Sequence, residues 1–326
     1  MLREHARRAA YSLSLSSPDS ATEVSSAMSS DLSTAEMVLP STERAAIRSW
    51  LMDMDGVLVH EQHMIPGADR FLSLLRERKL PFLVLTNNSL FTRRDLSARL
   101  RTSGLDVPEN AIWTSALATA RFLGDQRPGG SAFVIGEVGL TTALHAAGYT
   151  LTEQDPDYVV IGETRTYSFS RITQAIRHIV AGARLIATNP DPSGPSTEGP
   201  LPATGSLAAL ISSASGVSPY SVGKPNPLMM RTALNTINAH SESTAMIGDS
   251  MKTDILSGLE AGLETILVLT GITSPDDVDR FTYRPSRIVN SIADLVPELE
   301  ASEAEAKPDT RSGARKRRRQ QGSATP

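Results

Sequence analysis

The sequence predicts an α/β protein built on a doubly wound parallel sheet, with a second, smaller α/β layer inserted into it. Between about Arg48 and Glu298, short apolar runs alternate with stretches of helical spacing. Alternation of this kind is typical of βαβ units with right-handed crossovers. Breaks at 128–130 and 215–219 divide it into three blocks. The outer blocks are each too small for a complete sheet, so we expect them to be two halves of one core.

The first block, residues 45–128, contains three apolar runs of strand length, each followed by a helical stretch. The expected strands are Trp50–Met54, Phe82–Thr86 and Ala111–Thr114. The expected helices are Pro66–Arg78, Thr92–Thr102 and Ser115–Leu123. Within the first helix, Phe71, Leu74 and Leu75 have the spacing of one helix face, which we expect to be buried.

The inserted block, residues 129–217, repeats the pattern on a smaller scale, and we assign it to a cap domain. Its expected strands are Ala132–Gly136, Tyr158–Gly162 and Arg184–Thr188, and its expected helices are Gly139–Ala147, Ser170–Ala181 and Leu207–Ala214. The last block, residues 218–299, resumes the core. Its expected elements are the helix Pro227–Asn238, the strand Thr244–Ile247, the helix Asp254–Ala261 and the strand Thr265–Leu269.

Composition excludes several classes of protein. The chain has 326 residues, of which 40% are hydrophobic and 21% are charged, as is ordinary for a soluble globular protein. No apolar run approaches the roughly 18 residues of a membrane-spanning helix, so we expect no membrane partner. Cysteine is absent, which excludes disulfides, thiolate nucleophiles and Cys-ligated metal sites. Its absence fits a reducing compartment, and we expect the protein to be cytoplasmic.

Both ends of the chain are predicted to be disordered. Ten of the 22 residues from Ser12 to Ser33 are serine, a composition that cannot offset its own ordering entropy. We therefore assign residues 1–44 to a disordered extension, in which Met37 is a second candidate for the start of translation. We assign residues 300–326 to a disordered basic tail.

The charge of the chain is divided unevenly between the tail and the rest. Residues 307–326 carry seven Lys or Arg and one Asp, a net charge of +6, which leaves −10 on the remaining residues because the whole chain carries −4. Nucleic acid is therefore not an expected partner of the folded body. Any such attraction would come from the tail, whose Arg315–Arg319 cluster could equally be a solvated, non-specific segment.

The sharpest local signal is the segment Asp53-Met54-Asp55-Gly56, which directly follows an apolar strand. In open α/β sheets, ligands bind at the carboxyl ends of the strands. Two carboxylates that leave a strand two residues apart can act on one reacting centre, one as nucleophile and the other as general acid and then base. Taken alone, the segment could also be an ordinary turn or a calcium-type loop.

Three further polar groups follow later apolar segments. Thr86, Asn87 and Asn88 end the second strand and could hold an anion through hydroxyl, amide and backbone N–H groups. Lys224 lies between Gly223 and Pro225, just before a helix. Asp249 follows a later strand, and Asp254 lies at the next helix start, where it could also be a simple N-cap. Because all four groups lie at strand ends of one predicted sheet, we expect them to form one site.

This order of motifs resembles the haloacid dehalogenase superfamily, and more closely its NagD family, whose members carry an α/β cap between the second and third motifs. The likeness runs from about Ser49 to Leu295. Besides the four motifs, it includes the segments Gly162–Arg165, Ala187–Asp191, Thr253–Leu256 and Ala261–Leu267. The resemblance implies a Rossmann-like core with an inserted cap, and the hydrolysis of phosphomonoesters.

The resemblance also implies a role for each motif residue. Asp53 would attack phosphorus and form an aspartyl-phosphate, and Asp55 would protonate the leaving oxygen and then activate water. Mg²⁺ would be held by the carboxylates of Asp53 and Asp249 and by the backbone carbonyl of Asp55, with Asp254 orienting the site from behind. The residues that would bind phosphoryl oxygens are Thr86, Asn87 and Lys224. A divalent cation is also expected on chemical grounds, because a dianionic phosphate repels an anionic nucleophile.

The cap carries the candidate specificity residues Asn189 and Asp191, at the end of a predicted cap strand. The following segment, 192–200, contains no aromatic residue or histidine that could stack on a nucleobase. His60 and His63 lie three positions apart after the first motif and could approach substrate, although an exposed loop pair is the simpler interpretation.

The resulting functional hypothesis is a magnesium-dependent phosphatase acting on nucleoside monophosphates such as UMP. Sugar-phosphate, glycerol-phosphate and phosphoglycolate phosphatase activities are alternatives within the same class. Dehalogenase chemistry is disfavoured, because that branch lacks the second aspartate of the first motif and Asp55 is present here. A different class of hypothesis is a binding protein whose basic tail recruits nucleic acid or another partner. Nothing in the sequence indicates an oligomeric state.

Overall fold

The fold is described from a computed structural model, which describes residues 46–194 and 199–306. The expected disorder of residues 1–44 and the basic residues 307–326 lie outside the described residues. No helix within the described ranges is both long enough and apolar enough to cross a membrane.

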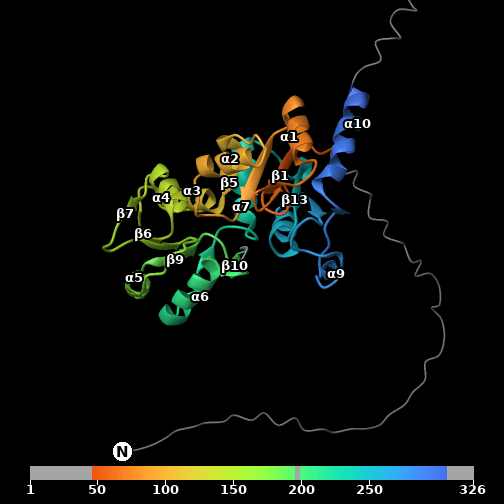
Figure 1. The fold of residues 1–326 in the computed structure, drawn as a ribbon. Coiled ribbons are helices and arrows are strands. Elements are labelled where there is room, and N and C mark those ends of the chain that lie inside the picture. The colour runs from red at the N-terminus through yellow and green to blue at the C-terminus, as the bar shows by residue number, and fades with distance from the viewer. Residues whose placement is uncertain (1–45, 195–198, 307–326) are drawn as a thin grey trace, which may run out of the picture. The chain divides into compact units, whose positions relative to one another are not determined.

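A six-stranded parallel sheet forms the core (Figure 1). Its strands are β1 (Ser49–Asp53), β4 (Phe82–Thr86), β5 (Ile112–Thr114), β13 (Thr244–Gly248), β14 (Glu264–Val268) and β15 (Arg287–Val289), in the order β15-β14-β13-β1-β4-β5. The central strand β1 pairs with β4 on one side and with β13 on the other, so the two outer sequence blocks meet in one sheet. The predicted α/β fold class is confirmed.

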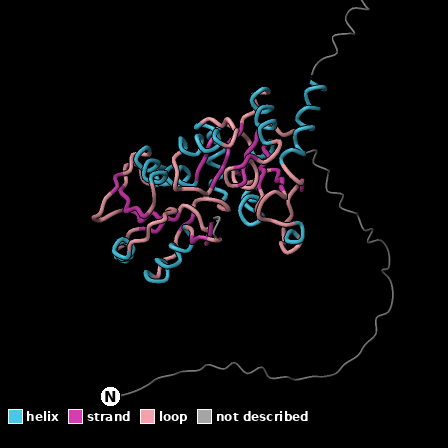
Figure 2. The backbone as a smooth tube through the Cα atoms, in the orientation of Figure 1, coloured by secondary structure: helices cyan, strands magenta, loops and turns pink. Residues whose placement is uncertain are grey.

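Helices follow the strands of this sheet, as the alternation predicts, and Figure 2 shows the two element types by colour. They are α1 (Ala68–Glu77), α2 (Arg93–Thr102), α3 (Ser115–Gln126), α7 (Pro227–Ile237), α8 (Leu256–Glu260), α9 (Pro275–Val278) and α10 (Val296–Ala306). Local sequence sets their starts. Thr92 and Asp95 form a reciprocal capping box at α2, and Asn226 caps α7, which has Pro227 at its first position.

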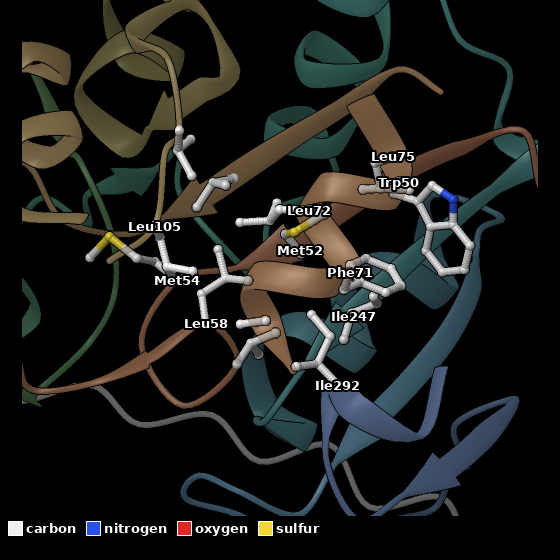
Figure 3. Close-up of a cluster of buried hydrophobic side chains, with 14 of the residues drawn as sticks. Trp50, Met52, Met54, Leu58, Phe71, Leu72, Leu75, Leu105, Ile247 and Ile292 are labelled. Atoms are coloured by element: carbon white, nitrogen blue, oxygen red, sulfur yellow. The ribbon is translucent and has the colours of Figure 1, made fainter. Parts of the chain in front are cut away.

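Side chains of the central strands alternate between two hydrophobic cores, one on each face of the sheet. Trp50 and Met52 of β1 belong to one core and Leu51 to the other. In the first core, the ring of Phe71 from α1 meets the Trp50 ring edge-on, with 5.2 Å between ring centroids. Figure 3 shows this cluster, in which Leu75 of α1 and Ile247 of β13 also take part. The predicted buried face of the first helix is therefore present.

The inserted block forms a second parallel sheet, the cap sheet. Its strands are β6 (Ser131–Ile135), β7 (Thr150–Leu151), β8 (Tyr158–Ile161), β9 (Arg184–Ala187) and β12 (Tyr220–Ser221), in the order β12-β9-β8-β6-β7. Its helices are α4 (Val138–Ala146), α5 (Phe169–Val180) and α6 (Thr204–Ser215). Because β12 pairs with β9, the cap sheet extends past the boundary that the sequence predicts at residue 217.

Two short hairpins complete the architecture. One joins β2 (Val59–His60) to β3 (His63–Met64) just after the first motif, and the other joins β10 (Ser193–Gly194) to β11 (Leu201–Pro202) in the cap.

The prediction that disorder begins at residue 300 is wrong for residues 300–306, which complete α10. Leu299 is buried in the core beside α1. The Arg70 guanidinium of α1 donates to Glu300 Oε1 from Nε at 3.0 Å and from Nη2 at 2.8 Å. Figure 1 shows α1 and α10 close together. Leu299 and Glu300 therefore pack the start of α10 against α1, a contact that composition does not reveal.

Candidate active site

The four polar groups singled out in the sequence meet at the carboxyl edge of the central sheet. Asp53 is the last residue of β1 and Thr86 the last residue of β4, while Asp249 directly follows β13. These strands are neighbours and run parallel, so their carboxyl ends lie side by side. Thr86 and Asp249 are buried, with 4% and 5% of their surface exposed.

Lys224 reaches this edge from the segment that returns from the cap to the core. Its Nζ donates to Asp53 Oδ1 at 2.7 Å and to Asp254 Oδ1 at 2.7 Å. The lysine and Asp254 are almost completely buried, and the Asp53 side chain keeps 15% of its surface exposed. One ammonium therefore joins the two carboxylates, and only Asp53 remains open to a ligand.

Asp254 lies inside a single π-helical turn, Met251–Ile255, that precedes α8. The N-cap interpretation of this residue is wrong, because Ser250 fills that position and its hydroxyl accepts from the Thr253 N–H. The second oxygen of Asp254 accepts from the Ser250 N–H at 3.2 Å. Within the described residues, a ligand oxygen from each of Asp53, Asp249 and Asp254 lies within 4.8 Å of the others.

Asp249 is held in place by two glycines that sequence reasoning did not single out for this purpose. Its Oδ2 accepts from the Ile272 N–H at 2.9 Å. A Cβ atom added to Gly271 would lie 1.8 Å from that oxygen, and one added to Gly56 would lie 2.4 Å from it. Only glycine permits this approach at both positions. The close approach of Gly271 is a tertiary contact, so no local sequence signal could have revealed it.

The electrostatics of the cluster fit a bound cation. Three carboxylates face one ammonium, which leaves an excess negative charge. Burial raises the pKa of Asp53, and the nearby charges of Asp254 and Asp249 add to this effect, while Lys224 opposes it. Burial and the Asp254 charge raise the pKa of Asp249 to about 6. A divalent cation would relieve this repulsion, and carboxylate oxygens are the hard ligands that such cations prefer.

Asp55 is more open than Asp53 and has a different cationic partner. Nη2 of Arg99, from α2, lies 3.1 Å from Asp55 Oδ1 and also donates to the Glu61 carbonyl at 2.7 Å. Burial raises the pKa of Asp55, and the Arg99 charge and hydrogen bond oppose that rise. Asp55 keeps 47% of its side chain exposed, so it can still reach a bound molecule. The sequence reasoning did not identify Arg99 as a member of the site.

The Asn87 side chain links the segment around Lys224 to the cap. Its Oδ1 accepts from the Lys224 N–H at 2.8 Å, and its Nδ2 donates to the Lys224 carbonyl at 3.0 Å. The same Nδ2 donates to Asp191 Oδ2 at 2.8 Å, and the Asn87 carbonyl accepts from Asn189 Nδ2 at 2.8 Å. Both candidate specificity residues of the cap therefore contact the loop that follows β4.

His60 and His63 occupy opposite positions of the β2–β3 hairpin and are exposed. Neither residue makes a side-chain hydrogen bond in the described part of the chain. The two histidines are therefore an exposed pair in a hairpin, as the simpler interpretation expects.

Comparisons with known proteins agree with this geometry. The family model described as haloacid dehalogenase-like hydrolase matches residues 50–150, and the model described as HAD-hydrolase-like matches residues 221–295. Between them lies most of the cap.

Three relatives cover the core and the cap together. The chain is 63% identical over 247 residues to a dihydroxyacetone phosphatase of Corynebacterium glutamicum, which covers 76% of this chain and 90% of that protein. It is 47% identical over 249 residues to the ribonucleotide monophosphatase NagD of Escherichia coli, with 76% and 98% covered. The crystal structure of a 4-nitrophenylphosphatase from Thermotoga maritima matches with a TM-score of 0.75 and 35% identity, covering 78% of this chain and 97% of that chain.

These matches cover 76–78% of this chain and at least 90% of each relative, and each of these relatives is named for phosphate-ester hydrolysis. They favour an enzyme over the binding protein that the basic tail suggests. The chain belongs to the haloacid dehalogenase-like hydrolases, and within them to the NagD-type phosphatases, and it is a phosphoric monoester hydrolase.

Proposed function

We propose that the chain is a magnesium-dependent phosphatase that hydrolyses small phosphomonoesters through an aspartyl-phosphate on Asp53. The position of Asp53 carries this proposal. It ends a central strand, and Lys224 holds one carboxylate oxygen at 2.7 Å. The other oxygen makes no hydrogen bond within the described residues, so it is available to attack phosphorus.

In the first step, the free oxygen of Asp53 attacks phosphorus and the bond from phosphorus to the ester oxygen breaks. Asp55 donates its proton to the departing oxygen, a role that its burial-raised pKa supports. In the second step, the Asp55 carboxylate takes a proton from water, whose oxygen attacks phosphorus. The bond from phosphorus to Asp53 then breaks, which releases phosphate and restores both aspartates.

Thr86 and Lys224 would bind the phosphoryl oxygens, the first through its hydroxyl and the second through its ammonium. The side chain of Asn87 is engaged with Lys224 and Asp191, so we infer that it supports the phosphate site by holding Lys224. Backbone N–H groups of the loop after β4 would then supply the direct contacts.

Asp53, Asp249 and the backbone carbonyl of Asp55 are the groups that would hold Mg²⁺. The cation would supply positive charge that offsets the repulsion between the phosphate dianion and the attacking carboxylate. Asp254 would stay behind this set, because Lys224 and the Ser250 N–H occupy its two oxygens.

For the substrate, we propose three-carbon phosphates, with dihydroxyacetone phosphate first. A relative at 63% identity bears the name of that activity. The cap segment 192–200 also lacks an aromatic residue or histidine to stack on a base. Nucleoside monophosphates such as UMP are the second candidate, because the relative at 47% identity is a ribonucleotide monophosphatase.

Phosphate release tests both parts of the proposal. The full chain is assayed on dihydroxyacetone phosphate, UMP and p-nitrophenyl phosphate, with Mg²⁺, after chelation, and after Mg²⁺ is restored. We expect activity to disappear on chelation and to return with Mg²⁺, and kcat/KM to be highest for dihydroxyacetone phosphate. Unchanged activity after chelation contradicts the metal dependence, and a higher kcat/KM for UMP selects the second candidate.

A further inference from the structure

Glu163 is a cap residue that the reaction described above does not use. It lies just beyond the carboxyl end of β8, and β8 pairs with β9, whose own carboxyl end leads to Asp191. Because the two strands are parallel neighbours, Glu163 and Asp191 leave the same edge of the cap sheet. Glu163 belongs to Gly162–Arg165, one of the segments that carry the resemblance to the NagD family.

One buried serine ties this edge of the cap to the core. Ser89, in the loop that follows β4, accepts from the Glu163 N–H at 2.8 Å and from the Thr188 hydroxyl at 3.1 Å. A Cβ atom added to Gly162 would lie 3.0 Å from the Ser89 hydroxyl oxygen, so glycine allows the close approach. The backbone of Glu163 is therefore fixed against the loop that follows Thr86 and carries Asn87.

The Glu163 carboxylate itself is partly buried and has no hydrogen bond or ion pair within the described residues. Burial raises its pKa, Arg165 lowers it, and the charges of Asp191 and Asp55 raise it further. Glu163 and Asp191 follow neighbouring parallel strands, and both are tied to the loop after β4, Glu163 through its N–H to Ser89 and Asp191 through Asn87. Arg165 is exposed and donates no hydrogen bond to Glu163 in the described part of the chain. A partly buried carboxylate without a protein donor can accept a hydrogen bond from a ligand.

We propose that Glu163 is a specificity residue that, together with Asp191, accepts hydrogen bonds from hydroxyl groups of the leaving group and excludes leaving groups that carry a carboxylate. This inference rests on the proposed function, because it takes the leaving oxygen to lie beside Asp55.

The chemistry of the site selects the class of substrate. Asp191 already receives one hydrogen bond from Asn87, and Glu163 receives none, so acceptors outnumber donors on the cap side. Polyol and ketose phosphates supply neutral hydroxyl donors to such a site. Phosphoglycolate would place a third carboxylate beside these two, in surroundings of reduced dielectric where like charges repel strongly. The inference therefore separates glycerol phosphate and dihydroxyacetone phosphate from phosphoglycolate among the substrates that the sequence leaves open.

The test compares Glu163→Gln and Glu163→Ala with the parent chain on glycerol 3-phosphate, dihydroxyacetone phosphate, phosphoglycolate and p-nitrophenyl phosphate. The matched control is Glu109→Gln, which makes the same chemical change at an exposed position before β5. This position lies at the amino ends of the central strands, whereas the site lies at their carboxyl ends. The measured quantity is kcat/KM for each substrate, divided by that for p-nitrophenyl phosphate in the same variant. Division by the p-nitrophenyl value removes effects on folding and on the shared chemistry.

We expect the parent chain to prefer glycerol 3-phosphate over phosphoglycolate. Glu163→Ala lowers the normalised value for glycerol 3-phosphate about tenfold or more, as for the loss of a hydrogen bond to a charged acceptor. Glu163→Gln raises the normalised value for phosphoglycolate, because a like charge is removed, and Glu109→Gln changes neither. Effects of opposite sign on the two substrates are not expected from a residue that only supports the fold.

Three results overturn the inference while leaving the phosphatase intact. In the first, the parent chain uses phosphoglycolate and glycerol 3-phosphate equally. In the second, the normalised values do not change in either Glu163 variant. In the third, a loss of p-nitrophenyl phosphate hydrolysis in the Glu163 variants accounts for every change seen with the other substrates. If the parent chain fails to hydrolyse p-nitrophenyl phosphate at all, it is the proposed function that fails.

Discussion

Asp53, Asp249 and Asp254 share one residue type, but their surroundings differ. Asp53 keeps an open oxygen at the end of β1, and Asp249 is positioned by a backbone N–H and two glycines. Asp254 is fully buried against Lys224. Sequence spacing predicted that these residues would meet, because each lies at or soon after the end of a strand of one parallel sheet. It could not predict how the oxygens are shared, because that depends on contacts between distant segments.

The nucleophile assignment predicts the behaviour of Asp53→Asn. The substitution keeps the size of the side chain and a hydrogen-bond acceptor for Lys224, but it removes the attacking charge. We expect phosphate release near the uncatalysed background and an unchanged thermal midpoint within about 2 °C. Phosphate assays and circular dichroism on the same preparation measure both. Substantial residual turnover would exclude the covalent route.

The acid–base assignment predicts that Asp55→Asn slows both chemical steps. Each step should lose about 10²–10⁴-fold, the usual contribution of a positioned proton donor or acceptor. The p-nitrophenolate leaving group needs little protonation, so the phosphorylation step should suffer less with p-nitrophenyl phosphate than with an alkyl phosphate. Rapid-quench measurement of phosphorylation separates the two substrates. Equal losses on both would show that Asp55 does not protonate the leaving oxygen.

Gly271→Ala tests a contact that the sequence did not reveal. The new methyl group would lie 1.8 Å from Asp249 Oδ2, so the carboxylate or the loop must move. We expect a higher Mg²⁺ concentration for half-maximal activity, by about tenfold or more, with little change in circular dichroism. Gly124→Ala in α3 is the matched control, because its added Cβ meets nothing within 4 Å. An unchanged Mg²⁺ dependence in Gly271→Ala would show that the Asp249 position is not needed for the metal.

At the scale of elements, the alternation of apolar runs and helical stretches predicted the main strands and helices of both sheets. It missed β7, β12 and β15, which have two, two and three residues. Strands this short carry too few residues for a period-two pattern, and they form because a neighbouring strand offers its edge. The π-helical turn around Asp254 was also missed, because single turns of this kind are rare and have no residue period of their own.

Packing of α1 on the central sheet predicts a large effect for Phe71→Ala. The side chain is fully buried and its ring meets the edge of Trp50. We expect the free energy of unfolding to fall by about 3–5 kcal/mol, as for other buried aromatic truncations. Phe169→Ala removes the same side chain from a position that is 86% exposed, and its effect should stay within about 0.5 kcal/mol. Denaturant titration compares the two, and similar losses would contradict the assigned core.

At the scale of the whole molecule, the two sheets contribute different residues to the candidate site. The central sheet brings the motif residues together at one edge, and the cap sheet brings Glu163, Asn189 and Asp191 to the loop that follows β4. The meeting of the core groups could be predicted from sequence, because each lies at or near a strand end of one parallel sheet. Substrate choice could not, because hydroxyl recognition can be achieved by many side chains and is decided by where the cap places them.

The ends of the chain supply the last prediction. The sequence predicts that residues 1–44 and the basic residues 307–326 do not fold against the body, so a chain trimmed to residues 45–306 should keep kcat/KM on dihydroxyacetone phosphate and p-nitrophenyl phosphate within about twofold. The C-terminal limit is 306 because α10 ends there and its Glu300 pairs with Arg70 of α1. Removing residues 307–326 also removes a net charge of +6, so any retention of the full chain on immobilised single-stranded DNA should disappear.

A second trimmed chain, ending at residue 295, is the control for this boundary. It lacks all of α10 and should unfold at a lower temperature, because the buried Leu299 and the Arg70–Glu300 pair are lost. If the 45–306 chain instead loses most of its activity while keeping its thermal midpoint, the terminal segments contribute directly to catalysis. If it keeps its binding to DNA, the binding surface lies on the acidic body, and the charge argument for the tail is wrong.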